Sequence, residues 1–310
     1  MSAGDHARHA EALRERLGRV GVWITSIGVA PAADERRAAA EIERLGFGAL
    51  WFGEAPRTKE AMAHAALLLG ATERLAVATG IANIYARDAV AALAGAAALG
   101  EAFDERFLLG LGVSHAPAVQ VRGHDYGKPV TAMRTYLDAM DEAPYEGPRP
   151  QDGVPRVLAA LRPRMLELAR DRAAGAHPYF VPVEHTARAR SVLGDGPLLA
   201  PEQAFVLETD AARARAAGRE HTRYYLRLPN YVNNLRDLGF GDEDFEDDGS
   251  DRLVDAIVAW GDAAAVAERV RAHHDAGADH VCLQPLAPSV DGALEQLRAV
   301  AGALSLPAQD

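Results

Sequence analysis

The chain has 310 residues, of which 49% are hydrophobic and 25% are charged, and this composition excludes disordered and collagen-like proteins. Its formal net charge of −11 argues against a nucleic-acid partner, because binding to a phosphate backbone needs a basic surface. No apolar run approaches the ~18 residues of a membrane span, and the N-terminal segment lacks the apolar core of a signal peptide. We therefore expect a cytoplasmic protein without membrane contact, and its single cysteine, Cys282, leaves the fold without an internal disulfide.

One local pattern recurs along the chain: an alanine-rich amphipathic segment, a glycine, and a short apolar run. The pattern predicts a helix, a left-handed stop and a strand. In the first copy, residues 35–45 form the helix, Gly46 follows, and residues 49–52 form the strand. Three further predicted helices end at a glycine in the same way: residues 58–69 before Gly70, residues 166–174 before Gly175, and residues 264–276 before Gly277.

The predicted strands are apolar on both faces, which is typical of parallel strands covered by helices. Eight βα units predict a single-domain α/β protein, a (β/α)8 TIM barrel over residues 1–310, with a doubly wound parallel sheet as the alternative. Residues 1–18 form a predicted helical extension. Residues 114–128 and an insertion at residues 228–260, before the last βα unit, are expected as extra loops at the C-terminal face. The predicted strands cover residues 20–27, 49–52, 75–81, 107–113, 155–161, 176–181, 204–207 and 280–286.

Barrel enzymes carry their chemistry just beyond the C-terminal ends of the strands, so the residues there are the candidates for a site. This set is largely neutral, and it lacks the His-x-His pair with which many metal hydrolases on this fold begin. No metal site is expected, because the histidines on predicted helices are interpreted as solvated surface residues: His6, His9, His64, His273 and His274. The strand-end residues are Ser26, Glu54, Asn83, Ser114, His115, Arg162, Tyr179, Glu208 and Gln284.

Two interpretations stay open for the residues that follow strands two and three. Glu54 could bind a ligand or act as an acid or base, or it could form an ion pair with Arg57 or Lys59. Thr79 and Gly80 could let a flat aromatic ring lie against the backbone, or they could reflect tight packing within the barrel.

Two glycine segments and one cover segment also have two interpretations each. The segment GLGVSH, residues 110–115, lacks the third glycine of a dinucleotide fingerprint, so its glycines either admit a ligand or occupy crowded core positions. Gly175 and Ala176 suit a phosphate held by backbone N–H groups, or Gly175 ends a helix. The segment LPNYVNNLRDLGF, residues 228–240, is suited to cover the cleft, or it is a surface helix with an apolar underside.

The segments WFGEA, ATGIANIYARD, FLLGLGVSH, GAHPYFVP and WGDAAAVAERVRAHHDAGADHVCLQPL occur in an order and spacing that resembles the luciferase-like monooxygenase superfamily. The resemblance covers residues 21–304 and is closest to the coenzyme F420-dependent oxidoreductase branch. It implies a bacterial luciferase-like barrel that holds a flavin-like tricyclic ring at its C-terminal mouth. A bulge in strand three, which often contains a non-proline cis peptide, would back the ring at Thr79, Gly80 and Ile81.

The resemblance also implies roles for individual residues. Glu54 matches the acidic position after strand two, and the next residue, Ala55, stands where some relatives carry a catalytic histidine. Glu54 and His115 are the implied catalytic residues. The implied cofactor-binding residues, of which Gly175, Ala176 and His177 would contact the cofactor phosphate, are Ser26, Glu54, Thr79, Gly80, Ile81, Asn83, Ser114, Gly175, Ala176 and His177.

The implied reaction is coenzyme F420-dependent hydride transfer between the deazaflavin and a small organic substrate, with Glu54 or His115 as proton donor. One alternative is an FMN-dependent luciferase-like monooxygenase, which uses reduced flavin and oxygen and needs a flavin reductase as partner. Another is a non-catalytic flavin-binding or deazaflavin-binding protein. Relatives are often homodimers. Because the chain is net negative, a phosphorylated coenzyme needs local positive charge, for which Arg57, Arg87 and Arg162 are candidates.

Overall fold

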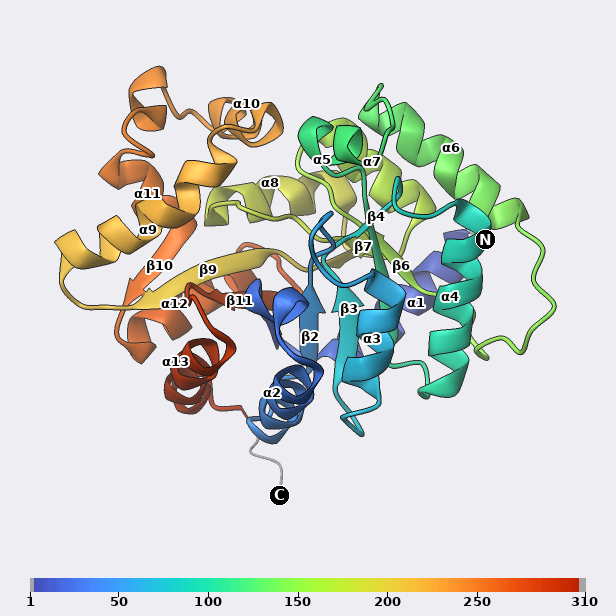
Figure 1. Ribbon diagram of the computed structural model, residues 1–310. Coiled ribbons are helices and arrows are strands. Elements are labelled where there is room, and N and C mark those ends of the chain that lie inside the picture. Colours follow the sequence, from blue (N-terminus) through green and yellow to red (C-terminus); the bar gives the residue numbers. More distant parts are fainter. Residues whose placement is uncertain (1–2, 307–310) are drawn as a thin grey trace.

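The computed structural model describes residues 3–306 and shows a ring of parallel strands surrounded by helices (Figure 1). Neighbouring strands follow the order β10-β9-β11-β1-β2-β3-β5-β6-β7-β8, and β4 lies beside β5. The strands are β1 (Val20–Trp23), β2 (Ala49–Phe52), β3 (Ala76–Thr79), β4 (Ala82–Asn83), β5 (Phe107–Gly112), β6 (Arg156–Leu158), β7 (Gly175–Ala176), β8 (Leu198–Leu199), β9 (Glu202–Leu207), β10 (Val258–Gly261) and β11 (Val281–Pro285).

The ring closes because β8 and β9 act as one barrel strand, interrupted only by Ala200 and Pro201. β8 pairs with β7, and β9 pairs with β11. The Ala200 N–H donates to the Ala176 carbonyl at 3.0 Å, and the Cys282 N–H donates to the Pro201 carbonyl at 2.9 Å. The predicted (β/α)8 barrel is therefore confirmed over the alternative doubly wound sheet. β10 lies outside the ring and pairs with the other side of β9.

Helices cover the outer face of the ring, and several of them begin at a capping side chain. Asp88, Asp262 and Ser289 each accept a hydrogen bond from a backbone N–H in the first turn, which stabilises a helix by about 1 kcal/mol. The helices are α1 (Ala3–Leu17), α2 (Ala32–Arg44), α3 (Ala61–Leu69), α4 (Ala89–Ala102), α5 (Ala116–Val121), α6 (Pro129–Glu142), α7 (Pro163–Arg172), α8 (Val183–Leu193), α9 (Ala211–Tyr225), α10 (Pro229–Asp237), α11 (Asp251–Ile257), α12 (Ala263–Asp275) and α13 (Val290–Ala303), with 3-10 turns η1 (Ser26–Val29) and η2 (Asp242–Phe245).

Two of the four predicted glycine stops are left-handed. Gly46 has a φ of +85° and Gly277 a φ of +101°, so both end their helices as predicted. Gly70 has a φ of −70° and is not a left-handed stop. Gly175 is not a helix stop at all, because it lies within β7. A Cβ at Gly175 would lie 2.0 Å from the Leu198 carbonyl oxygen, so the close approach of β8 requires glycine there.

The predicted elements differ from the structure mainly at their ends. β1 stops at Trp23, two residues without regular structure follow, and η1 begins at Ser26 within the predicted first strand. Within the predicted insertion, α11 ends at Ile257 and β10, which was not predicted, follows directly. Residues 114–128 contain α5, and residues 228–260 contain α10, η2, α11 and most of β10. α1 forms within the predicted extension at residues 1–18, of which residues 1 and 2 lie outside the described residues.

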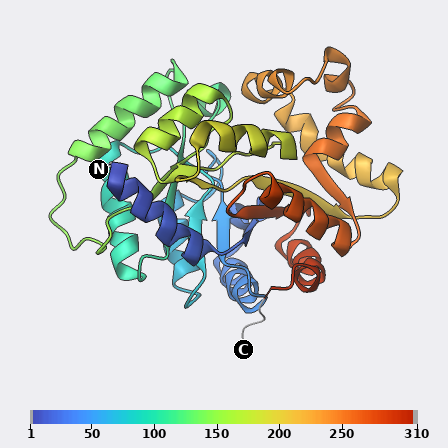
Figure 2. The same ribbon diagram turned by 180° about the vertical axis from the view of Figure 1, so that it is seen from behind.

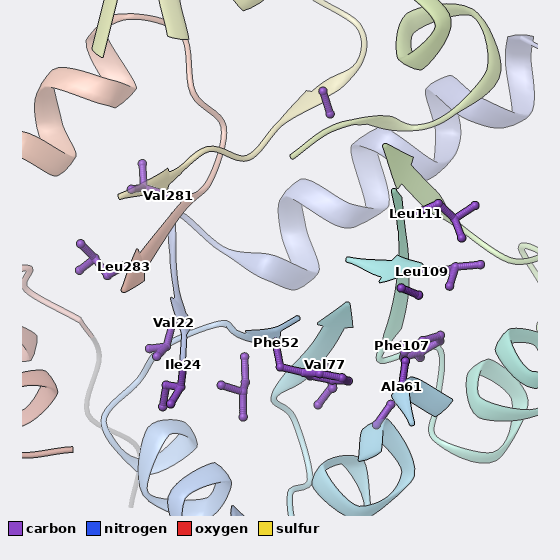
Figure 3. Packing of buried hydrophobic residues seen from close by; sticks show 14 of the residues in the cluster. Val22, Ile24, Phe52, Ala61, Val77, Phe107, Leu109, Leu111, Val281 and Leu283 are labelled. Atoms are coloured by element: carbon purple, nitrogen blue, oxygen red, sulfur yellow. The ribbon is translucent and has the colours of Figure 1, made fainter. Parts of the chain in front are cut away.

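The core has an outer layer between strands and helices and an inner layer within the ring. Val22, Phe52 and Val77 belong to the outer layer, part of which Figure 3 shows. The inner layer is built largely from small residues such as Ala76 and Ala78, with Trp51, and it also contains Ala10, Leu13 and Leu17 of α1. α1 (dark blue in Figure 2) therefore packs against the inner layer from the N-terminal ends of the strands.

Most of the helix histidines that were interpreted as solvated are instead buried: His6, His9, His64 and His273. His64 Nε2 lies 2.9 Å from a carboxylate oxygen of Glu35 on α2. The His273 ring nitrogens contact Thr186 Oγ1 and Gln203 Oε1, both at 2.8 Å. These partners come from other elements, so the helix pattern alone could not identify them. Across residues 3–306, no three His, Cys, Asp or Glu side chains converge as metal ligands, and no helix has the length and apolar character needed to cross a membrane.

Candidate functional site

A cavity of about 1180 Å³ lies at the C-terminal face of the barrel. Residues that follow β1, β2, β3, β5 and β6 line one side of it, and residues of α9 and α10 line the other. This is the face at which barrel enzymes place their sites. Six of the eleven implied catalytic and cofactor-binding residues line the cavity: Glu54, Gly80, Ile81, Ser114, His115 and His177.

The predicted bulge in the third barrel strand is present between β3 and β4, and the peptide bond between Gly80 and Ile81 is cis as expected. Three hydrogen bonds hold it: Gly80 N–H donates to the Phe52 carbonyl (2.7 Å), Glu54 N–H to the Ile81 carbonyl (3.2 Å), and the Trp23 indole N–H to the Gly80 carbonyl (3.2 Å). A Cβ at Gly80 would lie 2.6 Å from Trp23 Nε1, so packing requires this glycine as well. Both open interpretations of Gly80 are compatible with the structure.

Glu54 supports the bulge from behind. Its side chain is only 2% exposed and accepts hydrogen bonds from the backbone N–H groups of Asn83 (2.9 Å) and Ala61 (3.3 Å). Arg87 donates to both carboxylate oxygens, with Nη1 at 3.0 Å from Oε2. Both carboxylate oxygens are thus occupied by donors, an arrangement that fixes the position of Glu54 and the loop around it.

Glu54 does form the ion pair considered in one of its two interpretations, but its partner is neither Arg57 nor Lys59. Arg87 takes that place, and Lys59 lies 3.0 Å from Glu35 instead. Arg87 also donates from Nε to Glu60 at 3.0 Å. Because its donors are occupied by two carboxylates, Arg87 is not free to contact a phosphate.

His115 is the N-cap residue of α5, and its side chain faces α10 at the cavity wall. Its ring lies 5.5 Å from the ring of Tyr231, centroid to centroid. Burial lowers the pKa of His115 below its usual 6.5, and a hydrogen bond with Asn230 partly opposes this effect. Ser114 precedes it with a φ of +56°, and the Tyr126 hydroxyl donates to the Ser114 carbonyl at 3.0 Å. The predicted pair therefore reaches the cleft, with a neutral imidazole at neutral pH.

His177 lies beneath the bulge and is buried. Its Nδ1 lies 2.7 Å from the Ala200 carbonyl, so Nδ1 carries the proton and Nε2 is an acceptor. The ring stacks on Trp51 with centroids 4.4 Å apart. Burial lowers the pKa of His177 to about 4, which keeps the ring neutral. Within residues 3–306, Nε2 has no hydrogen-bond partner, although His177 borders the cavity.

The structure does not bring five of the predicted cofactor-binding residues to the cavity lining: Ser26, Thr79, Asn83, Gly175 and Ala176. Thr79 Oγ1 instead bonds to the Gly110 carbonyl (2.7 Å) and N–H (2.9 Å), which ties β3 to β5. Gly110 is a crowded core position, because a Cβ there would lie 1.9 Å from the Thr79 carbonyl oxygen. Gly175 and Ala176 are buried inside β7, which also explains why the helix-stop interpretation of Gly175 fails.

Positive charge reaches the cavity at the start of α7. Arg162 and Arg164 both line it, and Arg162 also pairs with Asp237 at 2.9 Å. The N-terminus of a helix adds backbone N–H groups and the positive end of its dipole. Of the three arginines expected to supply local charge, Arg162 reaches the cavity, whereas Arg57 does not line it and Arg87 is engaged by Glu54.

Aromatic side chains on α9 and α10 line the cavity, and α10 also has a buried apolar side, so both interpretations of residues 228–240 are compatible with the structure. Tyr225 and Tyr231 both line the cavity, with ring centroids 5.2 Å apart. Tyr179, which follows β7, lies 5.3 Å from Tyr225 and 5.3 Å from Trp23. The sequence interpretation missed Tyr225, although the adjacent tyrosines in YYLRLPNY directly before the predicted cover were an available signal.

Comparison with known proteins gives matches over most of the chain. Residues 16–280 match the luciferase-like monooxygenase family. Over 201 residues the chain is 24% identical to a 5,10-methylenetetrahydromethanopterin reductase from Methanolobus tindarius, and the match covers 56% of this chain and 62% of that protein, less than two thirds of its length.

Two solved structures share the fold. The coenzyme F420-dependent tetrahydromethanopterin reductase from Methanopyrus kandleri has a TM-score of 0.71 and 18% identity, covering 91% of this chain and 98% of that one. The oxygenating constituent of 3,6-diketocamphane monooxygenase from Pseudomonas putida, in complex with FMN, has a TM-score of 0.69 and 14% identity, covering 91% and 96%. Together with the family match, the barrel and its bulge confirm the resemblance, and the chain belongs to the luciferase-like monooxygenase family of oxidoreductases.

Proposed function

We propose that the protein is a coenzyme F420-dependent oxidoreductase that transfers a hydride between the deazaflavin and a small organic substrate. The observation that carries this proposal is the bulge at Gly80 and Ile81, which lines a cavity of about 1180 Å³. Ligand pockets typically measure roughly 300–1,000 Å³, so this cavity has room for a tricyclic ring and a substrate together. The Methanopyrus kandleri reductase, which shares the barrel, is coenzyme F420-dependent.

The residues around the bulge fit a planar heterocycle. His177 Nε2 is a buried acceptor without a partner in residues 3–306, and a donor group on the ligand would satisfy it. Gly80 places no side chain at the cavity wall, where a Cβ would lie 2.9 Å from His177 Nε2. When bound, the deazaflavin supplies a ring carbon that carries a hydride and reacts poorly with oxygen.

In this proposal Glu54 positions the bulge and His115 handles the proton. Both oxygens of the Glu54 carboxylate are held by donors, so the proton-donor role considered for it passes to His115. A neutral imidazole at the cavity wall can accept a proton from a substrate hydroxyl and return it in the reverse direction. The nearby Asn230 amide orients the ring.

The start of α7 is the proposed phosphate site, in place of Gly175 and Ala176. Arg162 and Arg164 provide charge there, and the helix N-terminus provides backbone donors. This location supplies the local positive potential that a phosphorylated ligand needs on a chain of net charge −11.

The test is a titration of oxidised coenzyme F420 with the purified protein, followed by the quenching of coenzyme fluorescence. We expect micromolar binding, weakened about tenfold or more in the variant carrying Arg162→Ala and Arg164→Ala. Arg57→Ala is the matched control, since Arg57 does not line the cavity, and it should bind as the wild type does. Tight FMN binding with no coenzyme F420 binding would overturn the proposal. Oxygen consumption with reduced FMN would then identify the monooxygenase, which needs a reductase partner.

A further inference from the structure

A chain of side-chain hydrogen bonds crosses the cavity wall from Tyr225 at the end of α9 to Thr25 after β1. The hydroxyl oxygens of Tyr225 and Tyr179 lie 2.7 Å apart. The Tyr179 hydroxyl lies 2.8 Å from Gln284 Oε1, and Gln284 Nε2 lies 3.1 Å from Thr25 Oγ1. Gln284 is 2% exposed, whereas Thr25, Tyr179 and Tyr225 all border the cavity.

The chemistry of these groups gives the chain one direction. An amide oxygen only accepts, so the single proton of Tyr179 goes to Gln284 Oε1. The Tyr179 oxygen therefore accepts the proton of Tyr225. At the other end, the Gln284 amide donates to Thr25 Oγ1, so the proton of Thr25 itself is not used within the chain.

Thr25 is well placed to give that proton to a ligand. Its side chain borders the cavity, and in residues 3–306 its hydroxyl donates to no protein acceptor. Trp23, two residues earlier, donates to the carbonyl of Gly80, so the end of β1 lies against the bulge. A hydroxyl that already accepts a hydrogen bond is also a stronger donor, because bonds in a chain polarise one another.

We infer that Thr25 donates a hydrogen bond to an oxygen acceptor on the ligand in this cavity, either a carbonyl or a deprotonated hydroxyl. Gln284 and Tyr179 are positioning residues that set the direction of this donor, whereas Tyr225 only donates to Tyr179. The inference rests on the proposed function only in taking this cavity as the ligand site. The acceptor oxygen belongs either to the cofactor ring or to the substrate.

The test compares Thr25→Val, which keeps the shape but removes the donor, with Thr25→Ser, which keeps the donor. Two titrations show whether the acceptor oxygen belongs to the cofactor or to the substrate. In the first, binding of oxidised coenzyme F420 is followed by fluorescence. In the second, the probe ketone cyclohexanone is titrated into the coenzyme-loaded protein and followed by calorimetry. Thr25→Val should raise the dissociation constant about tenfold in the first titration if the acceptor is on the ring, or in the second if it is on the substrate. Thr25→Ser should bind like the wild type in both.

Tyr225→Phe checks the direction, because it leaves both the Tyr179 bond to Gln284 and the Thr25 proton in place. It should change either constant less than twofold. The inference would be overturned if Thr25→Val left both dissociation constants unchanged. It would also be overturned if Tyr225→Phe weakened binding and Thr25→Val did not. If the wild type binds only FMN, the proposed function fails, and the same variants titrated with FMN and then with cyclohexanone test Thr25 separately.

Discussion

At the scale of single residues, Glu54 shows how a carboxylate can act through the backbone that it holds. Its partner Arg87 lies 33 positions further along the chain, on the loop after β4, so no local spacing rule could have paired them. The sequence could place Glu54 at a strand end, but it could not show that two backbone N–H groups also point at its oxygens.

Replacing Glu54 by glutamine should therefore reduce stability. The amide group would put N–H donors against Arg87 and a backbone N–H, and breaking a buried pair costs about 3 kcal/mol. Urea unfolding measures the change. Glu60→Gln is the control, because Glu60 is 52% exposed and its loss should cost no more than about 1 kcal/mol. Equal losses in both variants would contradict the role given to Glu54.

Glu202 makes stability depend on pH in a defined window. It is buried at the start of β9, accepts the Phe180 N–H at 3.0 Å, and burial raises its pKa to about 8. In the unfolded chain this carboxyl has a pKa near 4.3. The stabilisation that comes from the raised pKa is therefore fully present below that pH and is lost as the pH rises towards 8. Buried histidines whose pKa is lowered to about 4 change the free energy of unfolding only below pH 6.5. Above pH 6.5 we therefore expect the change to come from Glu202.

We expect the free energy of unfolding to fall by about 2 kcal/mol between pH 6.5 and 8, from a slope of about 1.4 kcal/mol per pH unit. Glu202→Gln should remove this slope, since an amide oxygen can still accept the Phe180 N–H and does not titrate. Urea unfolding at several pH values provides the comparison. A wild-type protein that is equally stable at pH 6.5 and 8 would contradict the expectation.

At the scale of elements, the barrel depends on close contact between neighbouring strands. Gly110→Ala should destabilise the junction of β3 and β5 by about 3 kcal/mol or more, because the new Cβ would lie 1.9 Å from the Thr79 carbonyl oxygen. Thermal unfolding measures the effect. Gly302→Ala in α13 is the matched control: nothing lies within 4 Å of its Cβ position, so stability should be unchanged or rise by less than about 1 kcal/mol. A mild loss of stability in Gly110→Ala would show that β3 and β5 can move apart at this junction, and it would contradict the expectation.

The same element scale shows what the sequence could and could not reveal. Eight apolar runs predicted the barrel correctly, because burial on both faces leaves a clear signal. Strand ends were less predictable, since apolar residues continue past the hydrogen-bonded ladder, as they do from Ile24 into η1. β10 was missed because its residues continue the apolar pattern of α11. The tyrosine-lined cover was predicted as a segment, but its contacts with Tyr179 depend on folding over a long range.

For the whole molecule, buried neutral histidines predict sensitivity to acid. Burial lowers the pKa of each to about 4, or to about 3 for the last of them: His6, His64, His177, His185, His280 and His273. Below pH 6.5 these histidines bind protons in the unfolded chain and not in the folded chain. Each can therefore lower the free energy of unfolding by up to about 1.4 kcal/mol for each pH unit of acidification. We expect cooperative acid unfolding above pH 4, measured by circular dichroism. A native spectrum retained at pH 4 would contradict it.

The position of α1 has a consequence for the order of kinetic events. Because α1 packs against the inner layer at the N-terminal ends of the strands, while the cavity lies at their C-terminal ends, the cofactor and the substrate of the proposed function would both enter from the C-terminal side of the barrel. In the proposed function the ring would bind against the bulge and the substrate beneath α10, so we expect the ring to bind first. The molecule that arrives last must leave first, so steady-state kinetics should follow a compulsory order with the cofactor as leading reactant.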